Sequence, residues 1–134
     1  MSNPIRTTKE IFEQLVEHAR AERPNESCGM LAAADGRFTA FFPAANEFAS
    51  PMRFRIDATD QIRIWNEIEA RGEEIAIFHS HPATEARPSQ TDINLATDWP
   101  GALWAICSLA EEEPTVRVFR IDGATVEEVE LVVE

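Results

Sequence analysis

The spacing of apolar residues changes along the chain between helical and extended patterns. Helical spacing runs from Thr7 to about Glu22 and again over 58–70, where Asp57 is a suitable N-cap and Gly72 ends the pattern. A short third helix is predicted over 89–98. The first apolar stripe, which ends near Pro24, consists of Ile11, Phe12, Leu15, Val16 and Ala19. The second stripe consists of Ile62, Trp65 and Ile68 or Glu69.

Extended patterns occupy most of the remaining chain. Residues 28–45 predict two strands joined at Asp35-Gly36, which is a strong hairpin signal. Residues 102–110 have the continuous apolar character of a central strand. The other predicted strands are 52–56, 73–78, and 115–121 and 125–133 around an Asp122-Gly123 turn. The sum is a single α/β domain over 1–134, with a mixed sheet and two or three helices.

Length and composition support one globular domain. The chain has 134 residues, is 44% hydrophobic and contains eight Phe and three Trp, which is enough to build a core without crosslinks. No apolar run approaches the roughly 18 to 20 residues of a membrane helix, and the N-terminal sequence lacks the apolar region of a secretion signal. The two cysteines, Cys28 and Cys107, lie far apart in the sequence. We therefore expect a cytoplasmic protein without a membrane partner.

Acidic residues strongly outnumber basic ones, with 24 Asp and Glu against 12 Lys and Arg and a net charge of -12. Nucleic-acid binding is driven by counterion release onto Lys and Arg, so a nucleic-acid partner is not expected. The acids are spread through the chain. A solvated surface explains them better than a docking face for a basic partner.

Two of the three histidines stand one residue apart at the end of an apolar strand. Because a strand sends residues i and i+2 to the same face, His79 and His81 can point at one spot. Asp92 offers a carboxylate eleven residues later, and Ser89 offers a hydroxyl between them. Ser89 and Asp92 also fit the N-cap and N3 positions of the third helix, which would explain these two residues without a metal. A same-face histidine pair has no comparable structural use, so a metal site is favoured, and capping is compatible with it.

This spacing resembles the signature of the JAMM (MPN-plus) zinc metalloprotease family, H-[ST]-H-x7-S-x-x-D. The matching residues are His79, Ser80, His81, Ser89 and Asp92. The resemblance covers nearly the whole chain and implies a curved mixed sheet flanked by helices, similar to the cytidine deaminase architecture. The catalytic glutamate of the family lies at the start of an early strand. The matching segment here, NESCGMLAA, assigns that role to Glu26 on resemblance alone.

The segment ATEARPSQTDINLAT is also similar to the small bacterial branch of this family that includes the CysO-cysteine peptidase, which trims a C-terminal adduct from a ubiquitin-like sulfur carrier. Family deubiquitinases carry insertions that grip ubiquitin, and the 42 residues after Asp92 (93–134) leave little room for the second of them. The resemblance therefore implies a zinc peptidase or isopeptidase that cleaves after the C-terminal Gly-Gly of such a carrier.

Two alternatives remain open. One is a protease of the same mechanism that acts on other ubiquitin-like conjugates or on unprocessed precursors. The other is a catalytically silent MPN-type binding module, which is disfavoured because this chain keeps every ligand. The sequence does not indicate the carrier, the residue removed or the oligomeric state.

The chemistry expected of the family follows from its ligands. His79, His81 and Asp92 would give Zn2+ three ligands and leave the fourth tetrahedral position to water, whose pKa falls to about 7. Glu26 would take a proton from that water and pass it to the leaving amine. The Ser89 hydroxyl would donate to the oxyanion, a contribution worth about 3 kcal/mol. The expected reaction is amide hydrolysis.

The cysteines and two arginines have weaker interpretations. Cys28 and Cys107 lack the P-C-x-x-C pattern of zinc deaminase ligands, and packed side chains are favoured for both. Arg53 and Arg55 alternate to one face of the 46–56 segment, which matches the position where family members receive substrate tails. One of them could hold a substrate carboxylate, although solvated charges on an edge strand are favoured. The residues expected in the core or at its edge are Trp65, Trp99 and Trp104.

Overall fold

Eight strands and three α-helices make up the part of the chain that the computed structural model describes, residues 3–134. The helices are α1 (Lys9–Glu22), α2 (Ala58–Ala70) and α3 (Gln90–Leu95), and a 3-10 turn at Ala96–Asp98 follows α3. The strands are β1 (Ile5–Thr7), β2 (Cys28–Ala34), β3 (Arg37–Ala44), β4 (Glu74–His81), β5 (Leu103–Ser108), β6 (Thr115–Asp122), β7 (Thr125–Val129) and β8 (Leu131–Val133). They form one mixed sheet in the order β7-β6-β5-β4-β2-β3-β1-β8.

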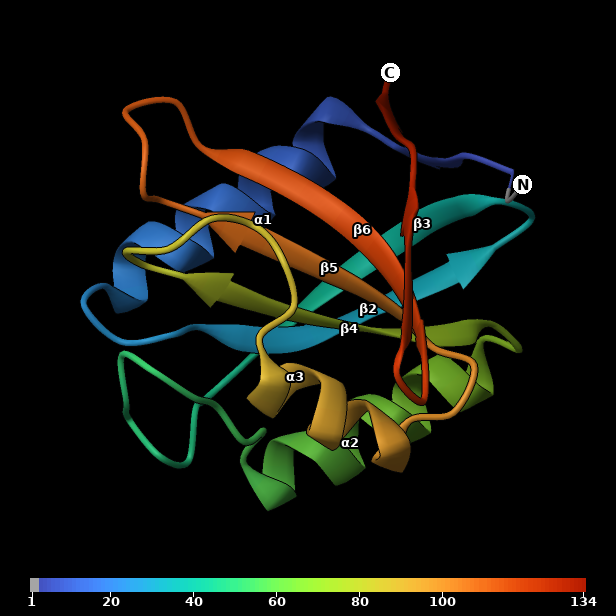
Figure 1. The fold of residues 1–134 in the computed structure, drawn as a ribbon. Helices are drawn as coiled ribbons and strands as arrows, with labels where there is room; N and C mark the ends of the chain where they lie inside the picture. The colour runs from blue at the N-terminus through green and yellow to red at the C-terminus, as the bar shows by residue number, and fades with distance from the viewer. Residues whose placement is uncertain (1–2) are drawn as a thin grey trace.

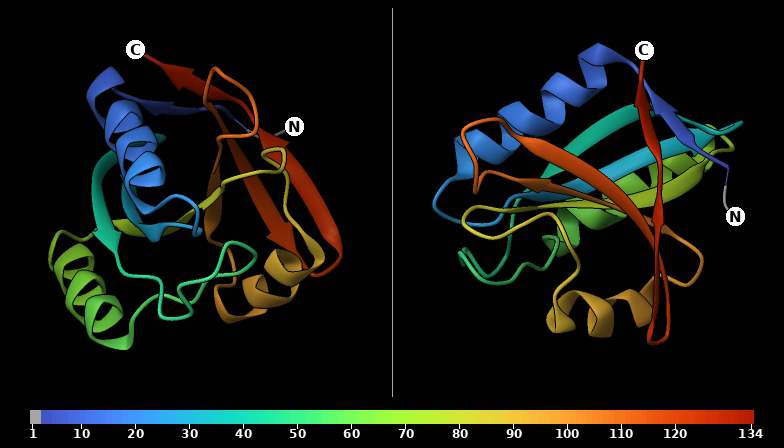
Figure 2. Two further views of the ribbon diagram at one scale, coloured as in Figure 1. Left: turned by 90° about the vertical axis from the view of Figure 1, so that its left-hand side faces the viewer. Right: turned by 45° about the horizontal axis from the view of Figure 1, so that its top comes forward.

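The sheet is curved and separates the helices into two layers (Figures 1 and 2). α1 covers one face, and α2 and α3 cover the other. Successive residues of a strand point to opposite faces, so each face has its own apolar cluster. The buried residues of α1 are Ile11, Leu15, Val16 and Ala19, as predicted. The expected α/β fold with a curved mixed sheet is therefore confirmed.

α1 and α2 begin close to the predicted positions, and a side chain caps the first turn of each. The Asp57 carboxylate accepts a hydrogen bond from the Asp60 N–H at 3.1 Å and caps α2. α1 begins two residues later than predicted because Thr7 belongs to β1. Thr8 is its N-cap and accepts from the Ile11 N–H at 3.1 Å.

The buried stripe predicted for α2 is only partly correct. Ile68 is fully buried, but Ile62 is 64% exposed and Trp65 is 41% exposed. Ile64, one turn before Ile68, is fully buried instead. α2 carries apolar residues on two neighbouring edges, and the sheet covers only one of them. On the other edge, Trp65 contacts Trp99, with ring centroids 5.8 Å apart.

The prediction of a strand over 52–56 is wrong. Side-chain burial alternates there as in a strand, but the only pairing recorded in this described segment is one bridge at its end. The Asn46 side chain takes the place of a neighbouring strand. Its amide nitrogen donates to the Arg53 carbonyl at 3.0 Å, and its oxygen accepts from the Arg55 N–H at 3.1 Å. Residues 46–56 therefore form a loop folded around Asn46, called the 46–56 loop below.

The C-terminal segment and the N-terminal strand differ from the prediction in three details. The last predicted strand divides into β7 and β8, and β8 leaves β6 to run parallel to β1. β1 (Ile5–Thr7) was not predicted, because three residues are too few to show a period. The second hairpin turn lies one residue further on, since Asp122 pairs with Thr125 and Gly123 has a φ of 60°. The Asp35-Gly36 turn is confirmed, with positive φ at both residues.

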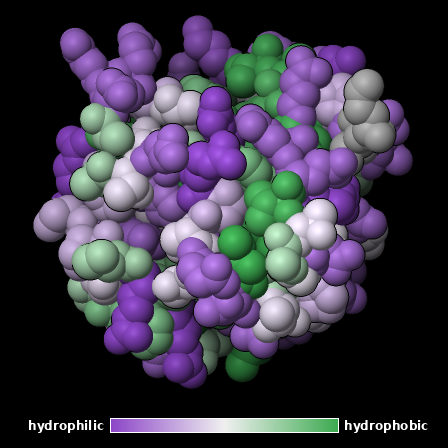
Figure 3. Space-filling view, viewed as in Figure 1, coloured by the Kyte–Doolittle hydropathy of each residue, from purple (hydrophilic) through white to green (hydrophobic). Residues whose placement is uncertain are grey.

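Other expectations about burial are met. Cys28, Cys107 and Trp104 are fully buried, and neither thiol is in a disulfide. Hydrophilic residues predominate on the face shown in Figure 3, with smaller hydrophobic patches between them. Among residues 3–134, no helix has the length and apolar character needed to cross a membrane.

The placement of α2 gives a first testable prediction. Ile64→Ala should lower the free energy of unfolding by about 2 to 5 kcal/mol, because it leaves a cavity between α2 and the sheet. Ile62→Ala makes the same change on the exposed edge and should change that free energy by less than about 0.5 kcal/mol. Urea unfolding followed by circular dichroism measures both. A larger loss for Ile62→Ala would contradict this placement.

Candidate metal centre and active site

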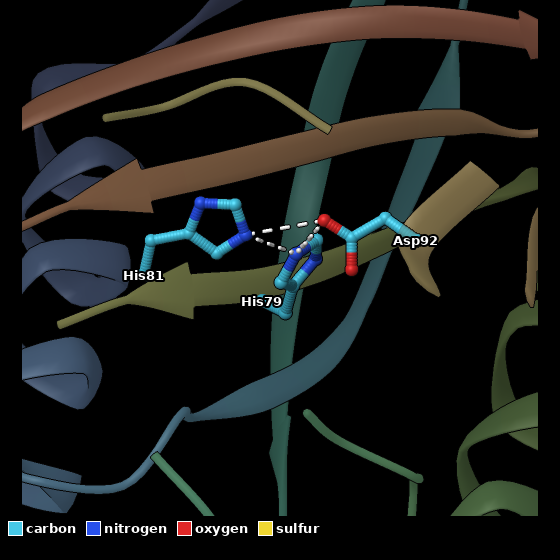
Figure 4. A group of neighbouring side chains, drawn as sticks. All are labelled: His79, His81 and Asp92. Carbon is cyan, nitrogen blue, oxygen red and sulfur yellow. Dashed lines mark hydrogen bonds and ion pairs between the residues drawn. The ribbon is translucent and has the colours of Figure 1, made fainter. Parts of the chain in front are cut away.

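The two predicted histidines lie next to each other at the carboxyl end of β4. Because His79 and His81 are two residues apart on a strand, both side chains point to the face that α2 and α3 cover. Their Nε2 atoms are 3.1 Å apart, and both residues are buried. Figure 4 shows the two rings directed toward Asp92.

Asp92 reaches the same point from the first turn of α3. Its Oδ2 lies 3.0 Å from the His79 Nε2 and 3.1 Å from the His81 Nε2. The residue is only 3% exposed, although it is an acid. The structure thus brings together, in one group that could hold a metal ion, the three side chains that the sequence proposed as ligands.

Ser89 and Asp92 also form the capping box predicted for the third helix. The Ser89 hydroxyl accepts from the Asp92 N–H at 3.1 Å, and the Asp92 Oδ2 accepts from the Ser89 N–H at 2.9 Å. The second bond fixes the orientation of the carboxylate toward the histidines. Capping and ligand geometry are therefore compatible, as expected.

The hydrogen bonds of His81 show that the point between the three side chains suits a cation. The His81 Nδ1 lies 2.8 Å from the Glu85 carbonyl oxygen, which can only accept, so Nδ1 carries a proton. The neutral ring then presents its Nε2 lone pair to Asp92 and His79. Two imidazole nitrogens and a carboxylate oxygen are ligands of zinc and related metals. These three atoms lie 3.0 to 3.1 Å from one another. In a tetrahedral zinc site, two ligand atoms are about 3.4 Å apart, so the observed distances are close to those of such a site.

The pKa values in this group show the same preference for positive charge. Burial disfavours the charged ring of His81, but hydrogen bonds to the Asp92 carboxylate and the Glu85 carbonyl outweigh it and raise the pKa of His81. Burial would also raise the pKa of Asp92, yet the two histidines and the Ser89 N–H bring it well below its usual range. Burial lowers the pKa of His79, which keeps that ring neutral and able to bind a metal.

Aromatic contacts orient the His79 ring. Phe54 stacks on it with centroids 4.5 Å apart and planes 17° apart, and Trp104 contacts it edge-on at 5.7 Å. The His79 Nδ1 has no hydrogen-bond partner among the described residues. Nothing in the sequence identified Phe54 as a site residue, since its only signal was an apolar position between Arg53 and Arg55.

Glu26 lies opposite His81 across the pairing of β2 with β4. Cys28 pairs with His79 in antiparallel register, so two residues earlier Glu26 stands opposite His81 on the same face. Glu26 is 5% exposed, and its Oε1 has no partner in the described part of the chain. Burial raises the pKa of Glu26 to about 8, with His81 opposing and Asp92 reinforcing the shift. A carboxyl group with this pKa exchanges protons near neutral pH.

A cleft of about 580 Å³ opens between the 46–56 loop, α2 and the end of α3. The residues that line it include Phe48, Phe54, Arg55, Trp65 and Trp99. Because Phe54 also stacks on His79, one wall of the cleft contacts the ligand group directly. Trp65 and Trp99, expected in or beside the core, lie at the rim of this cleft.

The two arginines of the 46–56 loop already have partners within it. Arg55 pairs with Glu47 at 3.0 Å, and the Arg53 guanidinium lies 4.1 Å from the centroid of the Phe48 ring. Both arginines are exposed. These contacts favour the interpretation of solvated charges over a preformed carboxylate site.

Two further residues with side chains that can bind metals, Cys28 and His18, make structural contacts instead. The Cys28 Sγ lies 3.3 Å from the Ala45 carbonyl oxygen, and burial raises the pKa of this thiol to about 12. The thiol is therefore protonated and packed, as the sequence favoured. His18, the third histidine, bonds the Cys28 carbonyl through Nε2 at 3.0 Å.

Comparison with known proteins shows which family this chain belongs to. A family model for prokaryotic homologs of the JAB domain matches residues 8–122. The CysO-cysteine peptidase of Mycobacterium tuberculosis is 39% identical over 130 residues, which cover 93% of this chain and 88% of that protein. The desampylase of Haloferax volcanii is 36% identical over 104 residues, covering 72% and 74%. The solution structure of a Desulfitobacterium hafniense protein superposes with a TM-score of 0.86 at 37% identity, covering 97% and 92%.

The family match extends from the start of α1 to the end of β6 and so includes every element that holds the candidate site. The ligand spacing, the fold and the similarity to named relatives agree. The chain therefore belongs to the family of prokaryotic JAB-domain homologues, the JAMM-type hydrolases whose signature its sequence carries.

Proposed function

We propose that this protein is a zinc-dependent peptidase that hydrolyses the amide bond after the C-terminal Gly-Gly of a small ubiquitin-like sulfur-carrier protein. The observation that carries the proposal is the convergence of the His79 Nε2, His81 Nε2 and Asp92 Oδ2 at one buried point beside a cleft. The similarity to the CysO-cysteine peptidase over most of both chains supports the choice of substrate.

The ligand group supports zinc in particular. His79, His81 and Asp92 would hold the ion through two nitrogens and one oxygen, a set that leaves a catalytic zinc open to a further ligand. When bound, zinc supplies Lewis acidity, which polarises a carbonyl and makes water more acidic near neutral pH.

Two more side chains would handle protons and charge. Glu26 would take a proton from the attacking water and pass it to the leaving amine, a role that its buried position opposite His81 supports. Ser89 would donate its hydroxyl proton to the carbonyl oxygen as negative charge develops there. The Ser89 oxygen already accepts from the Asp92 N–H, which holds the hydroxyl beside the ligand group and leaves its proton for another acceptor.

The cleft supports a tail without side chains as the segment before the cleaved bond. In this proposal, two glycines would lie against the aromatic lining of the cleft, where they need no room for side chains. Since residues 46–56 form a loop and not an edge strand, the tail would contact this loop without a continuous strand ladder. Arg55 would bind a substrate carboxylate only by giving up Glu47.

A second candidate function is deconjugation of ubiquitin-like proteins from lysine. The similarity to the Haloferax volcanii desampylase favours it, and the same groups would serve because an isopeptide bond is also an amide. A silent binding module is disfavoured, since all three ligand side chains are present and converge. Two buried thiols outside any disulfide support a cytoplasmic location for either function.

The metal assignment predicts about one zinc per chain. His81→Ala and Asp92→Ala should each lose most of this zinc, because two ligands bind the ion far more weakly than three. His18→Gln is the matched control and should retain it, since His18 bonds only a backbone carbonyl and neighbouring rings. Elemental analysis of the purified variants measures the effect. Full zinc occupancy in both ligand variants would contradict the assignment.

The role of Glu26 predicts a separation of chemistry from metal binding. Glu26→Gln keeps the size of the side chain but cannot accept the proton, so cleavage should fall at least about 100-fold while the zinc content stays unchanged. Steady-state kinetics and elemental analysis on the same preparation test this. Normal cleavage would remove Glu26 from the mechanism, and loss of zinc would make it a ligand instead.

The substrate assignment predicts selectivity at the two glycines. Carriers ending in Gly-Gly-Cys should lose the residue after Gly-Gly, whereas carriers ending in Ala-Ala-Cys should be cleaved at least about tenfold more slowly, because methyl groups crowd the cleft. A carrier joined to lysine through Gly-Gly separates the two candidate functions. Mass spectrometry of the products measures the cleavage of all three carriers. Equal cleavage of the Ala-Ala and Gly-Gly tails would contradict the proposed selectivity for glycine.

A further inference from the structure

Two buried serines lie behind the candidate ligands, on the sheet face that α1 covers. Ser80 stands between His79 and His81 in β4, and strand alternation turns its side chain to the opposite face. Ser27 directly follows Glu26. Ser27 is 1% exposed and Ser80 is not exposed at all. No role was assigned to either serine from the sequence beyond the match of Ser80 to the signature.

Three hydrogen bonds join these residues. The Ser80 Oγ accepts from the Ser27 N–H at 2.8 Å and from the Ser27 hydroxyl at 2.9 Å, and the Ser80 N–H donates to the Ser27 carbonyl at 3.1 Å. In a regular antiparallel pair, the Ser27 N–H would donate to a backbone carbonyl. Here the Ser80 hydroxyl takes the place of that carbonyl. We call this contact the Ser27–Ser80 clasp.

The clasp lies at the point where the chain leaves the ladder with β4. β2 begins at Cys28, so Ser27 and Ser80 extend the pairing by one position, and the next position places Glu26 opposite His81. The backbone of Glu26 is held on its other side as well. Its N–H donates to the Ser50 carbonyl at 2.8 Å, and its carbonyl accepts from the Asn46 amide at 3.1 Å.

The Glu26 carboxyl group depends on this backbone support, because its Oε1 has no hydrogen-bond partner among the described residues. A general base works only within hydrogen-bond reach of its proton, and a misplacement of about 1 Å can cost about 100-fold in rate. We infer that Ser80 is a positioning residue, whose buried hydroxyl binds Ser27 and thereby sets the Glu26 carboxyl opposite His81. This inference rests on the proposed function of Glu26.

Three variants separate the clasp from general packing. Ser80→Ala removes the acceptor of two hydrogen bonds and should lower kcat about 10- to 100-fold, with KM and zinc content unchanged. Ser80→Thr keeps the hydroxyl and should restore kcat to within about threefold. Ser27→Ala removes the Ser27 hydroxyl but keeps the Ser27 N–H bond to Ser80, so it should lower kcat less than Ser80→Ala does.

A separate control accounts for lost stability. Ile64→Val weakens the core under α2 without touching the clasp, and should keep kcat at a temperature where both proteins are folded. Full kcat in Ser80→Ala would overturn the inference. Loss of zinc in Ser80→Ala would overturn it too, because Ser80 would then support the ligands. An equal loss of kcat in Ile64→Val would assign the effect to packing.

Amide hydrogen exchange tests the clasp without a substrate. The Ser27 amide should exchange at least about tenfold faster in Ser80→Ala than in the unchanged protein, and Ser80→Thr should restore slow exchange. Slow exchange in Ser80→Ala would overturn the inference. If the unchanged protein cleaves no carrier, the proposed function fails, while the exchange result still decides whether Ser80 holds the segment that carries Glu26.

Discussion

Two imidazole nitrogens and a carboxylate oxygen meet at one buried point of this protein, and the group has a preference for positive charge. The Nδ1 of His81 is committed to the Glu85 carbonyl, so its other nitrogen faces Asp92 and His79 with a lone pair. Lone pairs about 3 Å apart in a water-poor interior repel each other unless a proton or a metal ion joins them. This constraint accounts for the raised pKa of His81 and the lowered pKa of Asp92. It also explains why the fit to a metal is a property of the fold and not only of the motif.

The end of β4 and the first turn of α3 each supply candidate ligands and also make hydrogen bonds that support the fold. β4 delivers both histidines to one face by simple alternation, while the serine between them turns to the other face and binds Ser27. The first turn of α3 brings Asp92, and the same carboxylate caps that helix. The buried Asp92 carboxylate is thus held in place by a hydrogen bond from the Ser89 N–H. The capping box therefore also orients Asp92 toward the two histidines.

Two different segments approach the ligand group, the 46–56 loop on one side and Glu26 on the other. The 46–56 loop is folded around Asn46, and it reaches the site through Phe54, which stacks on His79 and also lines the cleft. Glu26 approaches from the neighbouring strand and is held by its backbone. The family match over residues 8–122 includes both of these segments and all three ligand side chains.

The sequence alone determined the features that depend on near neighbours. It predicted the first hairpin, the Asp57 cap, the α1 stripe, the same-face histidines and the capping box, since each follows from residues within a few positions of one another. Tertiary structure alone decided which edge of α2 is buried, that residues 46–56 form a loop, and that β8 pairs with β1. It also decided that Glu26 faces His81 and that Phe54 covers His79, because strand register and loop packing join residues far apart in the chain, and no local pattern records such contacts.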